Sequence, residues 1–325
     1  MLSGKFLVPS YYKEFKCKCG ECKNCCCAGW NITLTLNDYS RLMNLECSQN
    51  LRDLINNGVS MFSHATEERY AKIDMNYYGE CKLRLENGWC GLQCEVGEDN
   101  IPSVCRYYPR GIREYPFKAS SISNSCEWVI EYLTKDLNPI TFEYLDLDFY
   151  INKDENIKIY PKNFSSLQKE IFDLFNSDLS FNEIFNKLAM LLNVNPVRND
   201  MFINNIINEL CHVYSHSYSI GDYIKSDNID VDTYLNEVNQ RDNNLNIYIK
   251  KILTNHMYFS LFPYVSSDLN LEYSFYGLYF IFLFWIKLIV ENKDVSFVDL
   301  SANFFRTAEH ANMYDIIYNN VRRFK

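Results

Sequence analysis

Glycine is scarce in this chain and is never spaced as in a phosphate-binding loop. Only 11 of the 325 residues are glycine, and no two of them lie two positions apart, so the pattern GxG is absent. Dinucleotide-binding folds and P-loops need closely spaced glycines so that the backbone can approach phosphate groups. The sequence therefore excludes these loops, together with the glycine-rich loop of Rossmann-type methyltransferases.

Positive charge is also in short supply. The chain has 32 Lys and Arg against 41 Asp and Glu, which gives a net charge of -9. Binding to nucleic acid needs clustered Lys and Arg, so we expect no nucleic-acid partner. Residues 1–30 differ locally, with five lysines against two glutamates. Cations beside thiols favour the thiolate, the form that binds metal, although a solvated lysine-rich surface would look the same.

Long apolar runs are lacking too. The most apolar run covers 275–286 and is followed by Lys287, which is short for a membrane span of about 20 residues. We expect a buried helix there and no membrane partner. The N-terminus has no apolar core typical of a secretory signal. These features predict a soluble cytoplasmic protein, in which reduced cysteines indicate metal binding or catalysis more often than disulfides.

Histidine motifs give little support for a catalytic site. The chain contains no HExxH, and no Ser/His/Asp arrangement can be identified in it. His212 and His216 are spaced i, i+4 near Cys211, on a predicted helix. They could bind a metal or form a partly buried polar edge. The other histidines are isolated in the sequence.

Cysteine is plentiful but unevenly distributed. Twelve of the thirteen cysteines lie between Cys17 and Cys126, and only Cys211 lies beyond them. We therefore predict two parts, a cysteine-rich metal-cluster region over 1–133 and a mainly helical domain over 134–325. The expected fold class is α+β and predominantly α-helical, with a small irregular cysteine-cluster region packed on the helical C-terminal domain.

Apolar periodicity predicts the elements of both parts. The N-terminal part shows a helix capped by Asn37, a second helix near 51–62, alternation over 70–75 typical of a strand, and an extended stretch over 117–126. Helical spacing then dominates in 166–176, 181–192, 201–214, 234–259 and 271–292. Two further segments have no such period: 76–116, predicted as irregular loop, and the acidic stretch 136–161, predicted as the connection.

The densest cysteine segment is FKCKCGECKNCCCAGW at 15–30, with six cysteines and two overlapping CxxC pairs. Such spacing lets one loop present several sulfurs to a metal. A second, dispersed group follows at Cys81, Cys90, Cys94, Cys105 and Cys126. An iron–sulfur cluster needs about four thiolates, so these residues could form one cluster, two metal sites, or a purely structural site. No triplet has the i, i+4, i+7 spacing of the radical S-adenosylmethionine motif.

The order of these cysteines resembles one family. The chain shows four features in order: FxCx4Cx3CCxGW at 15–30; Cys81, Cys90 and Gly97; CRYYPR at 105–110; and Cys126 after a serine-rich stretch. This order is similar to that of the flagellin lysine-N-methylases. The dense string alone is shared with a broader class of zinc- or iron-chelating proteins. The resemblance covers 15–126, and Cys19, Cys25 and Cys94 fall outside its pattern.

The resemblance implies a methyltransferase that uses S-adenosylmethionine and modifies lysine ε-amines of flagellin. It also implies an iron–sulfur cluster, [4Fe–4S], held by some of the eight matching cysteines: Cys17, Cys22, Cys26, Cys27, Cys81, Cys90, Cys105 and Cys126. Arg110 could hold a carboxylate such as that of S-adenosylmethionine, or be a surface arginine. The alternative function is a non-enzymatic protein with iron or zinc at the cysteines, as a redox sensor or structural site.

Overall fold

The structure, a computed structural model, describes residues 1–30, 32–151, 159–226, 228–241 and 244–325. The chain forms two compact units, one made of 16–110 and the other of 1–15 together with 111–325. We call them the cysteine unit and the helical unit. The fold class is α+β and mainly helical, as predicted, with the cysteine-rich part at the N-terminal end. The predicted domain boundary after residue 133 stays a prediction; the contacts divide the chain at other positions.

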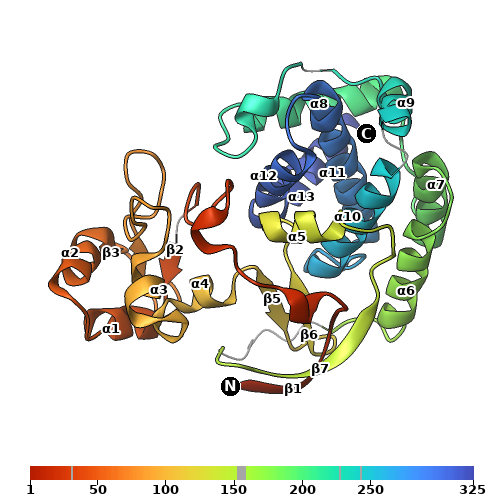
Figure 1. The fold of residues 1–325 in the computed structure, drawn as a ribbon. Helices are drawn as coiled ribbons and strands as arrows, with labels where there is room; N and C mark the ends of the chain where they lie inside the picture. Colours follow the sequence, from red (N-terminus) through yellow and green to blue (C-terminus); the bar gives the residue numbers. More distant parts are fainter. Residues whose placement is uncertain (31, 152–158, 227, 242–243) are drawn as a thin grey trace. The chain divides into compact units, whose positions relative to one another are not determined.

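The helical unit contains a four-stranded sheet in the order β5-β6-β1-β7 (Figure 1). Its strands are β1 (Leu2–Pro9), β5 (Arg110–Arg113), β6 (Ala119–Ile122) and β7 (Phe142–Phe149). β1 is parallel to β6 and antiparallel to β7. β6 confirms the predicted extended stretch, and all four of its residues are buried.

Strand β7 lies inside the segment predicted as a connection, and that prediction is wrong for 142–149. All eight residues of β7 pair with β1, from Phe142 opposite Pro9 to Phe149 opposite Leu2. Along β7, Leu145 and Leu147 are less exposed than the acidic residues between them. The acidic composition marks only the outer face of a strand, because alternate side chains point to opposite faces. Residues 152–158 of the predicted connection lie outside the described residues.

The cysteine unit contains a three-stranded antiparallel sheet in the order β2-β4-β3. These strands are β2 (Ile32–Leu34), β3 (Val59–Met61) and β4 (Ala71–Ile73), and β4 confirms the predicted strand. Helices α1 (Leu36–Met43) and α2 (Gln49–Gly58) pack beside it, around a core that includes Leu34, Leu51, Ile55 and Leu83. The predicted second helix was too long, because its last residues form β3.

Helix α1 begins two residues earlier than the sequence suggested. Its N-cap is Thr35, whose hydroxyl accepts from the backbone N–H of Asp38 at 3.1 Å. Asn37, the predicted cap, lies within the first turn and is exposed. Thr35 has the extended backbone of an N-cap residue, with φ -70° and ψ 164°, and so can satisfy a donor of the first turn.

Helices make up most of the helical unit (Figure 1). They are α5 (Glu127–Leu133), α6 (Phe164–Phe175), α7 (Phe181–Leu191), α8 (Asp200–Tyr214), α9 (Val231–Arg241), α10 (Leu245–Phe259), α11 (Leu271–Glu291), α12 (Phe297–His310) and α13 (Met313–Phe324). The five predicted helical segments are all helical, but the segment 234–259 is divided between α9 and α10. α12 and α13 were covered only by the general prediction of a helical domain.

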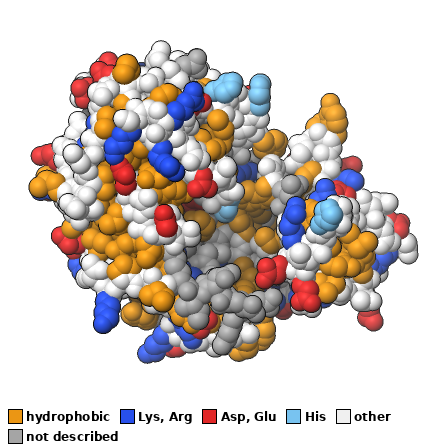
Figure 2. Space-filling model, turned by 180° about the vertical axis from the view of Figure 1, so that it is seen from behind, with side chains coloured by type: hydrophobic (Ala, Val, Ile, Leu, Met, Phe, Trp, Pro, Cys, Tyr) orange, Lys and Arg blue, Asp and Glu red, His pale blue; other side chains and the backbone are white. Residues whose placement is uncertain are grey.

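Helix α11 is the centre of the helical unit and contacts α7, α8, α9, α12 and α13. It is long and apolar enough to cross a membrane, but 94% of its most apolar 18-residue window is buried inside the protein. Such burial is typical of a core helix, as the sequence predicted. Lys287 is fully buried and donates to Glu291 at 2.5 Å and to the Ser226 hydroxyl at 2.9 Å. On the face in Figure 2, basic and acidic side chains are interspersed.

Candidate metal centre

The strongest candidate site is a turn at Cys25, Cys26 and Cys27 in the cysteine unit. Their three sulfur atoms lie within 4.8 Å of one another. The turn is closed by the Ala28 backbone N–H, which donates to the Cys25 carbonyl at 3.2 Å. The indole of Trp30 donates to the Cys26 carbonyl at 2.7 Å and braces the turn from the other side. These three cysteines could hold a metal ion.

The turn explains how adjacent cysteines can act together. In a regular backbone, neighbouring side chains such as those of Cys26 and Cys27 would point in different directions. The chain is not regular here, and Gly29 follows with a φ of +82° that favours glycine. Cys25, which lies outside the family pattern, is one of the three residues. Its sulfur accepts from the Cys27 backbone N–H at 3.3 Å.

A neighbouring segment places Cys81 beside this turn. The Cys81 backbone N–H donates to the Cys27 carbonyl at 2.6 Å, and the Gly29 N–H donates to the Gly79 carbonyl at 3.0 Å. Cys81 is only 4% exposed. The residues around 27–29 and 79–81 thus form a short two-stranded contact that fixes one buried thiol next to the turn.

Three more cysteines, Cys47, Cys90 and Cys105, pack against the same core. Cys90 precedes α3 (Gly91–Val96) and forms an isolated bridge with Arg84, while Cys105 lies in α4 (Ser103–Tyr107). Both contact the core cluster that contains Cys81 and is also contacted by Cys27. The thiols of Cys81, Cys90 and Cys105 also interact electrostatically with that of Cys25 or Cys26. Six cysteines therefore share one region of the cysteine unit: Cys25, Cys26, Cys27, Cys81, Cys90 and Cys105.

These thiols affect one another's protonation. Hydrogen bonds from the Cys26 and Cys27 thiols lower the pKa of Cys25 well below its usual value, and the positive charge of Arg84 lowers it further. The hydrogen bond to Cys25 raises the pKa of Cys26, and burial raises it further. Burial raises the pKa of Cys81 to about 11, and burial also raises the pKa of Cys105. The geometry thus favours a single thiolate that two thiols stabilise, and a metal would replace their protons.

Among the described residues, the group of sulfurs within 4.8 Å of one another does not include the other predicted site residues. Cys17 is exposed, Cys22 is half-buried, and Cys126 begins α5 in the helical unit. Arg110 is half-buried at the start of β5. His212 and His216 are both exposed, and α8 ends at Tyr214, so the two histidines do not share one helix. The i, i+4 spacing of this pair therefore does not produce a site on a helical face.

The three clustered sulfurs fit the chemistry of a thiolate-bound metal. Four sulfurs around one zinc, each about 2.3 Å from the ion, would lie about 3.8 Å from one another. Sulfurs that lie within 4.8 Å of one another in the turn are compatible with this value. Cys81, Cys90 and Cys105 are candidates for a fourth ligand, since their thiols interact electrostatically with that of Cys25 or Cys26. An iron–sulfur cluster needs the same kind and number of ligands.

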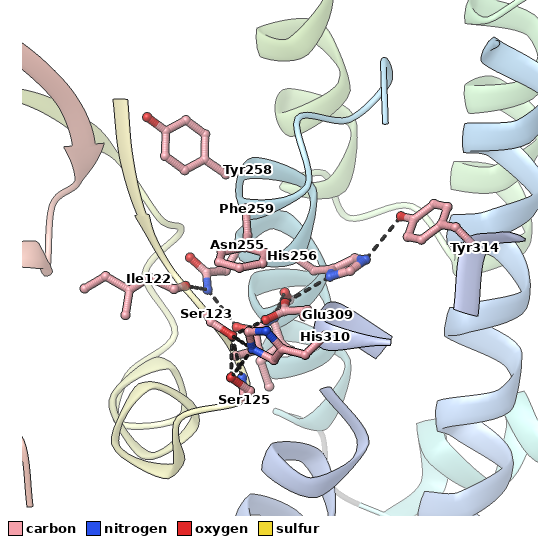
Figure 3. A network of polar contacts seen from close by, with 12 residues as sticks. Ile122, Ser123, Ser125, Asn255, His256, Tyr258, Phe259, Glu309, His310 and Tyr314 are labelled. Carbon is pink, nitrogen blue, oxygen red and sulfur yellow. Dashed lines mark hydrogen bonds and ion pairs between the residues drawn. The ribbon is translucent and has the colours of Figure 1, made fainter. Parts of the chain in front are cut away.

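A second polar constellation lies in the helical unit and was not predicted (Figure 3). The Glu309 carboxylate bonds to His256 Nδ1 at 3.0 Å and accepts from the Ser123 hydroxyl. His256 Nε2 lies 3.2 Å from the Tyr314 hydroxyl, and His310 Nε2 lies 2.8 Å from that of Ser125. The side chains of Glu309 and His256 are 0% and 1% exposed.

This network is not a Ser-His-acid triad. In a triad one histidine joins the serine to the acid. Here the serine hydroxyls contact His310, whereas the Glu309 carboxylate contacts His256. The network joins the end of α12 to α10 and to the turn between β6 and α5 (Figure 3). The contacts between its segments join residues 53 to 187 positions apart, and the serine-rich stretch at 117–126 was their one sequence signal.

A comparison with known proteins found a partial similarity to a flagellar protein. Over 130 residues the chain is 22% identical to the flagellar biosynthetic protein FliU of Salmonella muenchen, a match that spans 39% of this chain and 76% of that protein. No protein-family model matches the chain. No solved structure matches it either. The similarity is distant and partial.

Proposed function

We propose that this protein is an iron–sulfur-dependent methyltransferase that moves methyl from S-adenosylmethionine to lysine ε-amines of flagellin in the cytoplasm. The observation that carries the proposal is the group of three cysteines whose sulfurs lie within 4.8 Å of one another. It occurs within the ordered cysteine pattern that resembles the flagellin lysine-N-methylases. The distant similarity to FliU adds a flagellar context.

The proposed reaction sets clear requirements. A C–S bond of the sulfonium breaks, an N–C bond to lysine forms, and S-adenosylhomocysteine leaves. The amine must be neutral to attack, so its extra proton passes to a base. A [4Fe–4S] cluster would supply an electron-transfer centre. Its ligands would come from the turn at 25–27 and from Cys81, Cys90 or Cys105, and Arg110 stays the predicted residue for the carboxylate of S-adenosylmethionine.

A transfer assay tests this function. The protein is purified without oxygen and incubated with methyl-labelled S-adenosylmethionine, a reductant and flagellin from the same organism. The proposal predicts label in ε-N-methyllysine after hydrolysis of the flagellin. Absence of label there would reject it, provided that the metal group is intact and that binding of S-adenosylmethionine has been measured.

A second candidate is a non-enzymatic protein with a single zinc or iron ion. The compactness of the turn favours it, because sulfurs within 4.8 Å of one another suit one tetrahedral ion. This candidate predicts one zinc per chain, no sulfide, and no label on flagellin. Iron and acid-labile sulfide in similar amounts would reject the zinc alternative.

A further inference from the structure

The helical unit carries a small aromatic surface, made of residues outside the cysteine turn at 25–27. Trp128 stacks on Tyr132 with ring centroids 5.0 Å apart, and Phe15 meets Trp128 edge-on at 5.2 Å. These three side chains are half-buried. Tyr11 lies against both Trp128 and Tyr132 and is only 3% exposed. We call Phe15, Trp128 and Tyr132 the aromatic surface, with Tyr11 as its buried support.

The local sequence fixes this surface rigidly. Trp128 and Tyr132 are spaced i, i+4 on α5, so both lie on one face of that helix. The Tyr11 hydroxyl donates to the Asn255 side chain at 2.7 Å, and Asn255 donates in turn to the Asn124 side chain at 2.7 Å. The support therefore reaches α10 through buried hydrogen bonds, and the rings above it are held in place.

A carboxylate lies beside the surface. Tyr132 hydrogen-bonds to the Glu14 carboxylate, and burial together with this carboxylate raises the pKa of Tyr132 to about 12. Glu14 is exposed and so is available to a ligand. The Lys135 ammonium already lies 5.1 Å from the centroid of the Tyr132 ring. An aromatic face within about 6 Å attracts a cation through its quadrupole, and a nearby carboxylate adds to this attraction.

We propose that Phe15, Trp128 and Tyr132, together with Glu14, bind the lysine side chain of a partner polypeptide. The rings pack closely on one another, so the ligand lies on their exposed faces and edges and not inside a closed cage. Lys135 occupies part of the surface in the free protein and competes with the ligand. Only the identity of the partner as flagellin rests on the proposed function; the recognition of a lysine cation does not.

Fluorine NMR on the full chain tests this inference. The four tryptophans are labelled as 5-fluorotryptophan, and the signal of Trp128 is assigned with Trp128→Phe. The probe is the blocked tripeptide Gly-Lys-Gly, compared with the same peptide carrying ε-acetyllysine. We expect the Trp128 signal to shift saturably with the lysine peptide and several-fold less at equal concentration with the acetylated one, which has no charge.

Matched variants separate this site from general electrostatics. Tyr132→Leu should weaken binding by about threefold, a typical effect for one exposed ring. Glu14→Gln should weaken it as well, and Lys135→Met should strengthen it. Asp173→Asn is the control, since it removes the same charge from an exposed position on α6. Equal shifts with both peptides, or equal effects of Glu14→Gln and Asp173→Asn, would overturn the inference.

The inference and the proposed function fail separately. Lysine binding at Trp128 without methyl transfer would reject the methyltransferase and keep the binding surface. Methyl transfer that is unchanged by Tyr132→Leu, with no shift of the Trp128 signal, would reject the surface and keep the methyltransferase.

Discussion

Cys25 is the residue whose role depends most on the turn that carries it. In the sequence, Cys25 lies outside the cysteine pattern that resembles the flagellin lysine-N-methylases, and so it reads as a spare thiol. In the structure, its sulfur is close to two other thiols and accepts a backbone N–H from Cys27 at 3.3 Å. A sulfur with two thiol neighbours and a low pKa is suited to bind metal as a thiolate.

Replacement of this sulfur should remove the metal. We predict that Cys25→Ser lowers the bound metal per chain by at least about tenfold, because a hydroxyl is a poor substitute for a thiolate. Elemental analysis of the protein after anaerobic desalting measures the change. Cys211→Ser is the matched control, since Cys211 is buried in α8 and donates to the Ser226 carbonyl. Equal metal content in both variants would contradict the assignment.

His310 gives a pH dependence of stability. Desolvation of its ring lowers the pKa of His310 below its ordinary value of 6.5. The unfolded chain therefore binds more protons than the folded one between these two pKa values, and stability rises with pH through this window. As the pH falls below about 6.5, protonation favours the unfolded state, and this part of the stability is lost.

We predict that His310→Gln flattens this dependence. The wild-type protein should gain more stability between pH 5 and pH 7.5 than the variant does, measured by urea unfolding at each pH. His216→Gln is the control, because His216 is exposed beyond the end of α8. The same slope for wild type and His310→Gln would contradict the role of His310.

At the scale of elements, α1 shows how a single side chain sets a helix start. Thr35 accepts a hydrogen bond from Asp38, and the Asp38 carboxylate also accepts from the Ser103 hydroxyl at 2.6 Å. The cap thus links α1 to α4. We predict that Thr35→Ala lowers the free energy of unfolding by about 1 kcal/mol, and that Asn37→Ala has almost no effect. Chemical denaturation of the two variants measures this difference, and equal losses would contradict the role of Thr35 as the cap.

Elements with a regular apolar period are the ones that the sequence predicts. The strand at 71–73 and the long helices carry a clear apolar period, so they were predicted correctly. β7 was missed because its outward positions are acidic, and this charge hid the alternation of Leu145, Leu147 and Phe149. The turn at 25–27 could be suspected from its cysteines, but the convergence of three adjacent thiols depends on an irregular backbone that no period encodes. The network around Glu309 depends on contacts between distant segments.

At the scale of the whole molecule, the two units differ in what stabilises them. The helical unit has α11 as a fully buried centre, whereas the cysteine unit has a small core made of short elements. Small cores gain much of their stability from metals or disulfides. The cysteine unit contains eleven of the thirteen cysteines, and none of the cysteines in the described residues forms a disulfide.

Metal removal should therefore loosen the cysteine unit selectively. We predict that an iron and zinc chelator increases amide hydrogen exchange in 16–110, most strongly around β2 and β4, and leaves α11 protected. Hydrogen exchange followed by mass spectrometry, with and without the chelator, measures both units in one sample. An equal increase in α11, or no change in 16–110, would contradict this division.

The central claim joins the cysteine centre to the methyl transfer, and one measurement tests both. Labelled methyl on flagellin lysines is quantified with the intact anaerobic protein, with the same protein after removal of its metal, and after reconstitution with iron and sulfide. We predict label with the first, its loss with the second and its return with the third. Undiminished transfer by the metal-free protein, or no transfer by the intact protein, would contradict the account.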